Sequence, residues 1–131
     1  MRIYPARLPE NLQATHPILI EEMLALVKSG KKRPIAAIIK MVKDLKENGR
    51  ESRYLVRMGN YPIYELKTRA RGGQTGGTRV YLFLTEHDEA GLVTCEVKDD
   101  DAADPEKLKL TARVAIAHRK GIPVLQKRRH P

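Results

Sequence analysis

The residues of this chain whose types could do chemistry are mainly lysines and arginines. They number 25 against 16 acidic residues, which gives a formal net charge of +9 over 131 residues. Such an excess attracts polyanions by electrostatics alone, so nucleic acid is the first partner to consider. Arg69 and Arg71 open a segment, residues 69–77, that holds four glycines. This segment is typical of a mobile, positively charged loop whose arginines either contact phosphates or are simply solvated.

Other reactive side chains give weaker signals. The four histidines lack metal-ligand spacing, and the glycine-rich segment lacks the Gly-Lys-Ser/Thr ending of a nucleotide-binding loop. The acidic run over residues 99–104 lacks the spacing of a calcium loop, so we expect neither a metal nor a cofactor. Cys95, the only cysteine, lies between strand valines, which indicates a buried structural thiol and a reducing compartment.

The charge is distributed unevenly along the chain. Between Glu96 and Glu106 there are six acids and one base, Lys98, so this stretch carries a net charge of −5 and the remainder +14. We therefore expect one basic face that suits a phosphate backbone, and one acidic corner that is kept away from it.

Length and composition predict a single soluble domain. The chain has room for one core, and its 41% hydrophobic and 31% charged residues are typical of a globular fold. The longest apolar runs are shorter than the ~18–20 residues that span a bilayer, and the N-terminus does not resemble a signal peptide. We expect a domain over residues 1–125, a basic flexible tail over residues 126–131, no membrane contact and a cytoplasmic location.

Helical periodicity is found on both sides of the middle of the chain. Apolar residues recur at helical spacing over residues 17–28 and again over residues 34–48, which predicts two helices joined at a basic elbow. Asp104 and Pro105 form a helix start, an N-cap followed by a proline, and this third helix should end at Gly121. His118 lies in its last turn, where a cation suits the helix C-terminus.

The middle of the chain alternates with a period of two, which predicts strands. We expect a short edge strand within residues 1–7. Four further strands are expected over residues 54–58, 61–68, 78–85 and 91–98. In the strand over residues 78–85, Val80 and Leu82 share one face, and Arg79, Tyr81 and Phe83 share the other. The predicted fold is α/β (α+β), a small, mostly antiparallel sheet. The helical hairpin and the C-terminal helix should cover its apolar face, and the other face should be open and basic, so that Arg79 need not enter the core.

This order of elements resembles the RelE/ParE toxin superfamily, in particular its HigB-like, phage-derived branch. Members carry Glu-Leu-Arg at the end of one strand, then an Arg-Val-aromatic strand, then a strand that leads to a helix started by proline. Here these appear as Ile63–Lys67, Arg79–Phe83, and Val97-Lys98 before Asp104-Pro105. The likeness covers residues 50–120. The chain departs from the pattern at Lys67, where the family has arginine, and at residues 99–101, where three aspartates replace lysines.

The resemblance implies a toxin-like component of a bacterial or phage toxin–antitoxin pair. Such a protein would cleave messenger RNA without a metal, by attack of the 2′-hydroxyl on the adjacent phosphate. This reaction needs a base, cations around the phosphorus and an acid. The matching positions are Lys67, Arg79 and Lys98, with Arg79 on the phosphate and either lysine as the base. Contacts to RNA are expected from three further residues: Arg69, Arg71 and His118. The implied partners are RNA or the ribosome and a cognate antitoxin.

Other interpretations of the same residues stay open. A ParE-like protein would bind a target such as a topoisomerase and cleave nothing, and a nonenzymatic domain would bind nucleic acid through its charge alone. Each basic residue named above could also be an ordinary solvated side chain on an open sheet face. Four aromatic residues could stack on bases or pack within the fold: Tyr61, Tyr64, Tyr81 and Phe83.

Overall fold

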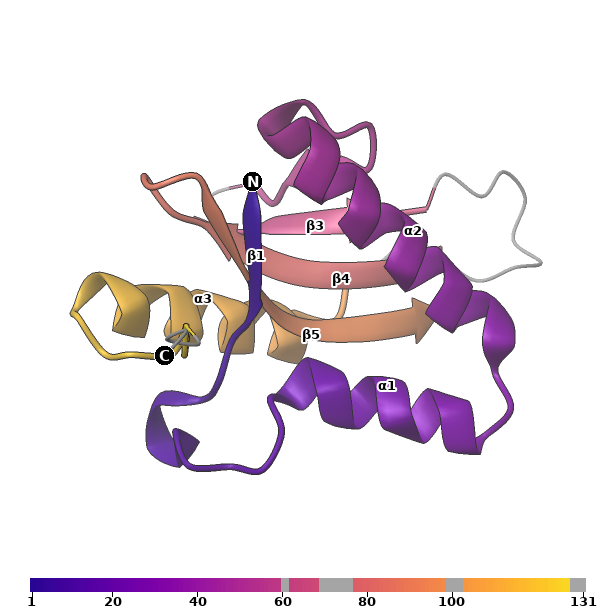
Figure 1. Cartoon of the computed structure of the whole chain (residues 1–131), viewed down its shortest axis with the longest axis horizontal. Helices are drawn as coiled ribbons and strands as arrows, with labels where there is room; N and C mark the ends of the chain where they lie inside the picture. The colour runs from indigo at the N-terminus through magenta and orange to yellow at the C-terminus, as the bar shows by residue number, and fades with distance from the viewer. Residues whose placement is uncertain (60–61, 69–76, 99–102, 128–131) are drawn as a thin grey trace.

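The computed structural model describes residues 1–59, 62–68, 77–98 and 103–127, which form helices on both sides of one sheet (Figure 1). The elements, in chain order, have these bounds: β1 Arg2–Pro5, η1 Pro9–Asn11, α1 Ile18–Lys28, α2 Lys32–Asn48, η2 Gly49–Glu51, β2 Leu55–Arg57, β3 Tyr64–Lys67, β4 Gly77–Leu84, β5 Glu89–Lys98 and α3 Pro105–Arg119. The predicted loop over residues 69–77 lies outside the described residues except for Gly77, and so does the end of the predicted tail, residues 128–131.

The five strands form one sheet in the order β1-β5-β4-β3-β2, in which β1 runs parallel to β5 and the other pairs are antiparallel. The register between β4 and β5 shifts once, because Tyr81 pairs with Thr94 but Leu82 pairs with Leu92. Val93 is the extra residue of this bulge. Leu92 belongs to the core on one face of the sheet and Val93 to the core on the other, as consecutive strand residues do.

The helical hairpin α1–α2 covers one face of the sheet. Residues of α2 at helical spacing, Ile38, Met41 and Leu45, are fully buried and pack with Leu66 and Val80 of the sheet. These positions form one stripe of the helix because they are three and four residues apart. The hairpin and its basic elbow are therefore confirmed, with the second helix beginning two residues before Pro34.

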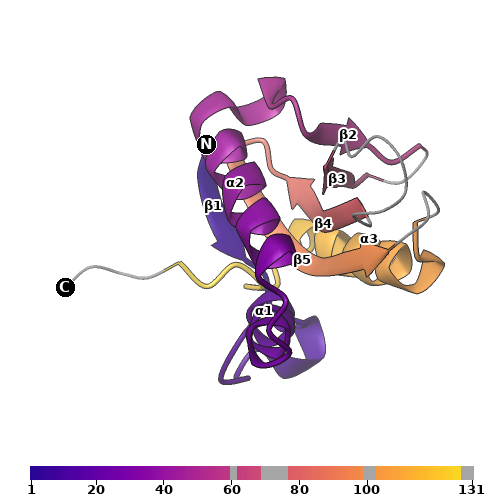
Figure 2. The ribbon, with the colours of Figure 1, turned by 90° about the vertical axis from the view of Figure 1, so that its right-hand side faces the viewer.

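Helix α3 covers the opposite face, as Figure 2 shows. It begins as the sequence predicts, because the Asp104 side chain accepts a hydrogen bond from the Glu106 amide and Pro105 occupies the first turn. Its buried residues Val114 and Ala115 pack with Phe83 in a second core.

The prediction of one open, basic sheet face is wrong. Both faces are covered: Arg79, which the period of two places on the face expected to be open, is 1% exposed, and Tyr81 on the same face is 0% exposed. The physical reason is that α3 packs over the face that carries Phe83, while the hairpin covers the face of Val80 and Leu82. The coarser prediction, an α+β domain with a mostly antiparallel sheet, is confirmed. In the described residues, no helix combines the length and the apolar character that a membrane span requires.

Candidate functional site

Four polar side chains meet on the α3 side of the sheet, near the first turn of α3. We call Glu65, Arg79, Tyr81 and Glu96 the charged cluster. The strand register places them together, because Glu65 lies opposite Tyr81 and Arg79 lies opposite Glu96. They alternate along the strands with residues of the core under α2, so they share the other face. Three neighbouring strands therefore position the cluster.

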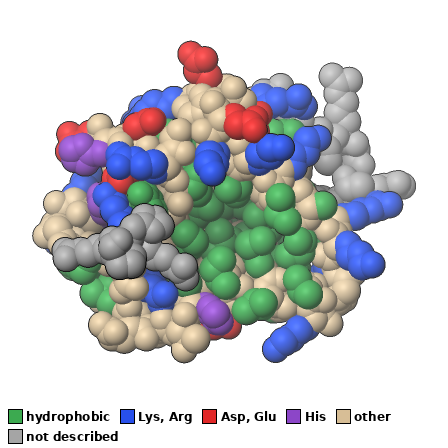
Figure 3. Space-filling model, viewed as in Figure 1, with side chains coloured by type: hydrophobic (Ala, Val, Ile, Leu, Met, Phe, Trp, Pro, Cys, Tyr) green, Lys and Arg blue, Asp and Glu red, His purple; other side chains and the backbone are tan. Residues whose placement is uncertain are grey.

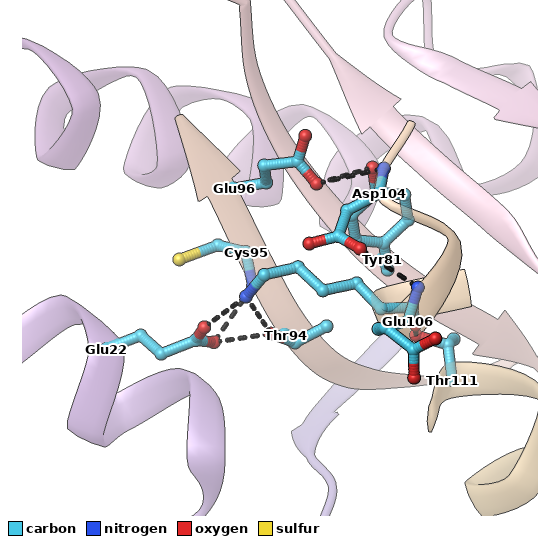
Figure 4. A network of polar contacts seen from close by, with 9 residues as sticks. Glu22, Tyr81, Thr94, Cys95, Glu96, Asp104, Glu106 and Thr111 are labelled. Carbon is cyan, nitrogen blue, oxygen red and sulfur yellow. Dashed lines mark hydrogen bonds and ion pairs between the residues drawn. The ribbon is translucent and has the colours of Figure 1, made fainter. Parts of the chain in front are cut away.

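The members of the cluster are buried and linked to one another. Arg79 Nε lies 3.8 Å from Glu65 Oε2, and the Tyr81 hydroxyl donates a hydrogen bond of 3.1 Å to Glu96 Oε2. The same Glu96 oxygen accepts a hydrogen bond of 3.3 Å from the backbone N–H of Asp104, which ties the cluster to the start of α3 (Figure 4). The two carboxylates are only 5% and 7% exposed. Arg79 is thus the buried cation between two buried acids.

Burial and charge change the proton affinities within the cluster. Burial raises the pKa of Glu65, with the nearby charge of Arg79 opposing the shift. Burial also raises the pKa of Tyr81, to about 12. Burial alone would lower the pKa of Arg79, but the hydrogen bond with Tyr81 and the charge of Glu65 raise it. Glu65 therefore takes up a proton more readily than an exposed glutamate does.

Lys67 and Arg79, two of the three predicted catalytic residues, lie at this end of the sheet. The backbone of the third, Lys98, lies there as well. Lys67 is half-buried in β3 and pairs with Arg79 across the two strands. Lys98 ends β5, two residues after Glu96, and its backbone pairs with Gly77. The register thus brings the three predicted positions to neighbouring strand ends. Arg69 and Arg71 lie outside the described residues.

His118 does not join them. It lies in the last turn of α3, and its ring packs on Phe83 with centroids 5.4 Å apart. Phe83 is four residues along β4 from Arg79, about 13 Å of strand. His118 and Arg119 line a cavity of about 630 Å³ beside the β4–β5 turn, on a different part of the molecule from Lys67.

Sequence reasoning missed the two carboxylates. In the sequence, Glu65 stands out only as part of a motif, and Glu96 only as part of the acidic corner. The signal was present in the period of two, because Glu65 and Lys67 alternate with apolar residues in one strand and Thr94 and Glu96 do so in another. Polar residues on the same face of three consecutive strands must meet, and this argument would have found the cluster.

Three exposed arginines at the β2 edge of the sheet were also missed. Arg50, Arg53 and Arg57 lie in and around η2 and β2, the edge strand next to β3, and we call them the basic edge. The Arg53 guanidinium lies 5.0 Å from the centre of the Tyr54 ring, and Arg50 donates a hydrogen bond of 3.4 Å to the Tyr64 hydroxyl. These contacts hold cations at the sheet edge, where a polyanion could reach them.

The site offers groups for proton transfer and for binding negative charge. Glu65 can accept a proton, Lys67 supplies a partly accessible cation, and the basic edge extends this positive charge along the surface. Among the described residues, no three histidine, cysteine or acidic side chains gather in a way that could hold a metal ion. The comparisons with known proteins found no matching family model, no matching curated protein and no matching solved structure.

Proposed function

We propose that this protein is a toxin-like component of a bacterial or phage toxin–antitoxin pair that cleaves RNA without a metal. The observation that carries the proposal is the convergence of Lys67 with the buried charged cluster. Lys67 ends β3, the strand that pairs with the β2 edge and its exposed arginines. RNA would lie along the basic edge with its scissile phosphate at Lys67. A cognate antitoxin would keep the protein inactive.

The stability that the fold gives up by burying these charges supports this proposal. Burying two carboxylates and a guanidinium stabilises a fold less than well-packed apolar side chains of similar volume would. Buried charges of this kind, with shifted pKa values, occur preferentially at functional sites. On the α3 side of the sheet, polar residues replace apolar ones only where the charged cluster lies. Ile63 and Phe83, further from the cluster on the same face, belong to the apolar core.

In the proposed reaction Glu65 takes the proton of the 2′-hydroxyl, and the 2′-oxygen forms a bond to the adjacent phosphorus. The bond from phosphorus to the 5′-oxygen then breaks, and a lysine ammonium protonates the leaving oxygen. Lys67 and Lys98 are the lysines assigned to the phosphate and the leaving group. Arg79 lies 3.8 Å from Glu65 and opposite Glu96 in the register, so it acts as a positioning residue that holds the two carboxylates. The products are a 2′,3′-cyclic phosphate and a 5′-hydroxyl end.

The test is cleavage of free and ribosome-bound RNA by the purified protein in the presence of EDTA, with analysis of the new ends. We expect cyclic phosphate ends, and a loss of rate of about 10²-fold or more in Lys67→Ala and in Glu65→Gln. Lys109→Ala, which removes an exposed lysine of α3, is the control that should cleave normally. Intact RNA in every condition, with folded wild-type protein, would contradict the proposal.

A second candidate function is RNA binding without cleavage. The basic edge favours it, because exposed arginines on a strand edge bind phosphates whether or not chemistry follows. Salt-sensitive binding of RNA that leaves its length unchanged would select this function over the first.

A further inference from the structure

An apolar groove lies on the face of the molecule opposite to the charged cluster. It is bounded by α1, α2 and β1, and it encloses a cavity of about 510 Å³. Leu19 and Leu92 form part of its lining, together with Ile20 and Met23 of α1 and Val42 of α2. Figure 3 shows it as a hollowed hydrophobic area with lysines and arginines around much of it.

The side of the groove formed by α2 is both apolar and cationic. Ile39 lines the groove and is 57% exposed. Lys43 and Lys46 also line it, four and seven residues after Ile39, so the three side chains share one side of the helix. Among the described residues no acidic side chain lines the groove.

These two properties define what the groove can bind. An exposed apolar depression with a polar rim is typical of an interaction surface. Its apolar surface needs an apolar face to cover it, which a nucleic acid backbone does not present. Its cations need negative charge, which a second copy of this chain, at a net charge of +9, does not supply.

We propose that the groove binds an amphipathic, acidic helix of a partner protein. The apolar face of that helix covers Ile39 and Val42, and its flanking carboxylates pair with Lys43 and Lys46. The charged cluster lies on the other face of the sheet, so this interaction is independent of RNA cleavage. It holds whether the protein is a ribonuclease or a binding module.

The proposal is tested with a labelled synthetic peptide of about 20 residues that forms a helix with leucines on one face and glutamates elsewhere. Its affinity for the full-length protein is measured by fluorescence anisotropy. We expect Ile39→Asp, and separately Lys43→Glu with Lys46→Glu, to weaken binding at least tenfold. Val27→Asp is the matched control, because Val27 is 61% exposed on α1 and does not line the groove; it should bind as wild type does.

Two further measurements decide against other occupants. A peptide of the same composition in scrambled order should bind at least tenfold more weakly, and equal binding would overturn the proposal by showing that charge alone suffices. Sedimentation should find a monomer. A dimer that dissociates in the Ile39→Asp variant would instead show that the groove binds a second copy of this chain. Lys67→Ala should bind the peptide as wild type does, so this proposal and the cleavage proposal fail separately.

Discussion

The most unusual residue of the fold is Arg79, a guanidinium that is 1% exposed between two acids. Replacing it by alanine leaves Glu65 and Glu96 buried without their cation, and loss of one partner of a buried pair costs about 3–5 kcal/mol. We therefore expect Arg79→Ala to lower the free energy of unfolding in urea by about that amount. Adding Glu65→Gln should recover part of the loss, because the second change removes one of the stranded charges. A loss below about 1 kcal/mol in the single variant would show that the cluster is hydrated.

Cys95 gives a residue-scale prediction about pH. Burial, with a smaller contribution from the charge of Glu22, raises the pKa of the Cys95 thiol to about 12 from its ordinary value near 9. The unfolded chain therefore loses this proton first, so stability is fully present below about pH 9 and falls as the pH rises toward 12. Urea midpoints measured at pH 8 and pH 10.5 should drop further in wild type than in Cys95→Ala. Equal drops in the two proteins would mean that the thiol ionises freely in the folded state.

At the scale of elements, a polar network holds α1, β5 and α3 together. Lys107 Nζ of α3 lies 2.6 Å from Glu22 Oε2 of α1 and donates a hydrogen bond of 3.0 Å to Thr94 Oγ1 of β5. The other Glu22 oxygen accepts hydrogen bonds from the Thr94 hydroxyl and the Cys95 amide (Figure 4). β1 pairs with β5 only as far as Leu92, so Glu22 satisfies an amide beyond the end of that pairing.

This network should contribute measurably to stability. We expect Lys107→Ala to lower the free energy of unfolding by about 1–3 kcal/mol, because it leaves a partly buried carboxylate without its charged donor. The matched control is Lys109→Ala on the same helix, whose ion pair with Glu106 is exposed on both sides; we expect a change within about 0.5 kcal/mol. Denaturant titrations of the two variants would contradict the role of the network if their midpoints coincide.

Individual elements differ in how far the local sequence determines them. The start of α3 could be predicted because Asp104 and Pro105 form an N-cap with a first-turn proline, and both act within one turn. The face shared by Arg79 and Tyr81 could be predicted from a period of two. That this face is covered could not be predicted, because it depends on which side of the sheet α3 packs against, and no local pattern specifies that choice.

At the scale of the whole molecule, the net charge predicts a polyanionic partner but not its position. The hairpin carries Lys43 and Lys46 beside an apolar groove, while Arg53 and Arg57 lie just before and at the end of the edge strand β2, which pairs with β3. The two basic surfaces differ in what accompanies the charge, and this difference appears only when the chain is folded. The fold therefore distributes the excess positive charge over separate surfaces, which we assign to different partners.

This division can be tested by the salt dependence of RNA binding. Each phosphate contact that is lost should make the slope of log K against log salt shallower by about 0.7 for single-stranded RNA, because fewer counterions are released. We therefore expect Arg53→Ala with Arg57→Ala to reduce the slope by about 1.4 and to weaken binding at low salt. Lys109→Ala with Lys120→Ala changes the net charge equally, at exposed positions in and just after α3, and should leave the slope unchanged. If both double variants reduced the slope equally, RNA would be bound by the diffuse charge of the whole surface, and the assignment of the basic edge would be wrong.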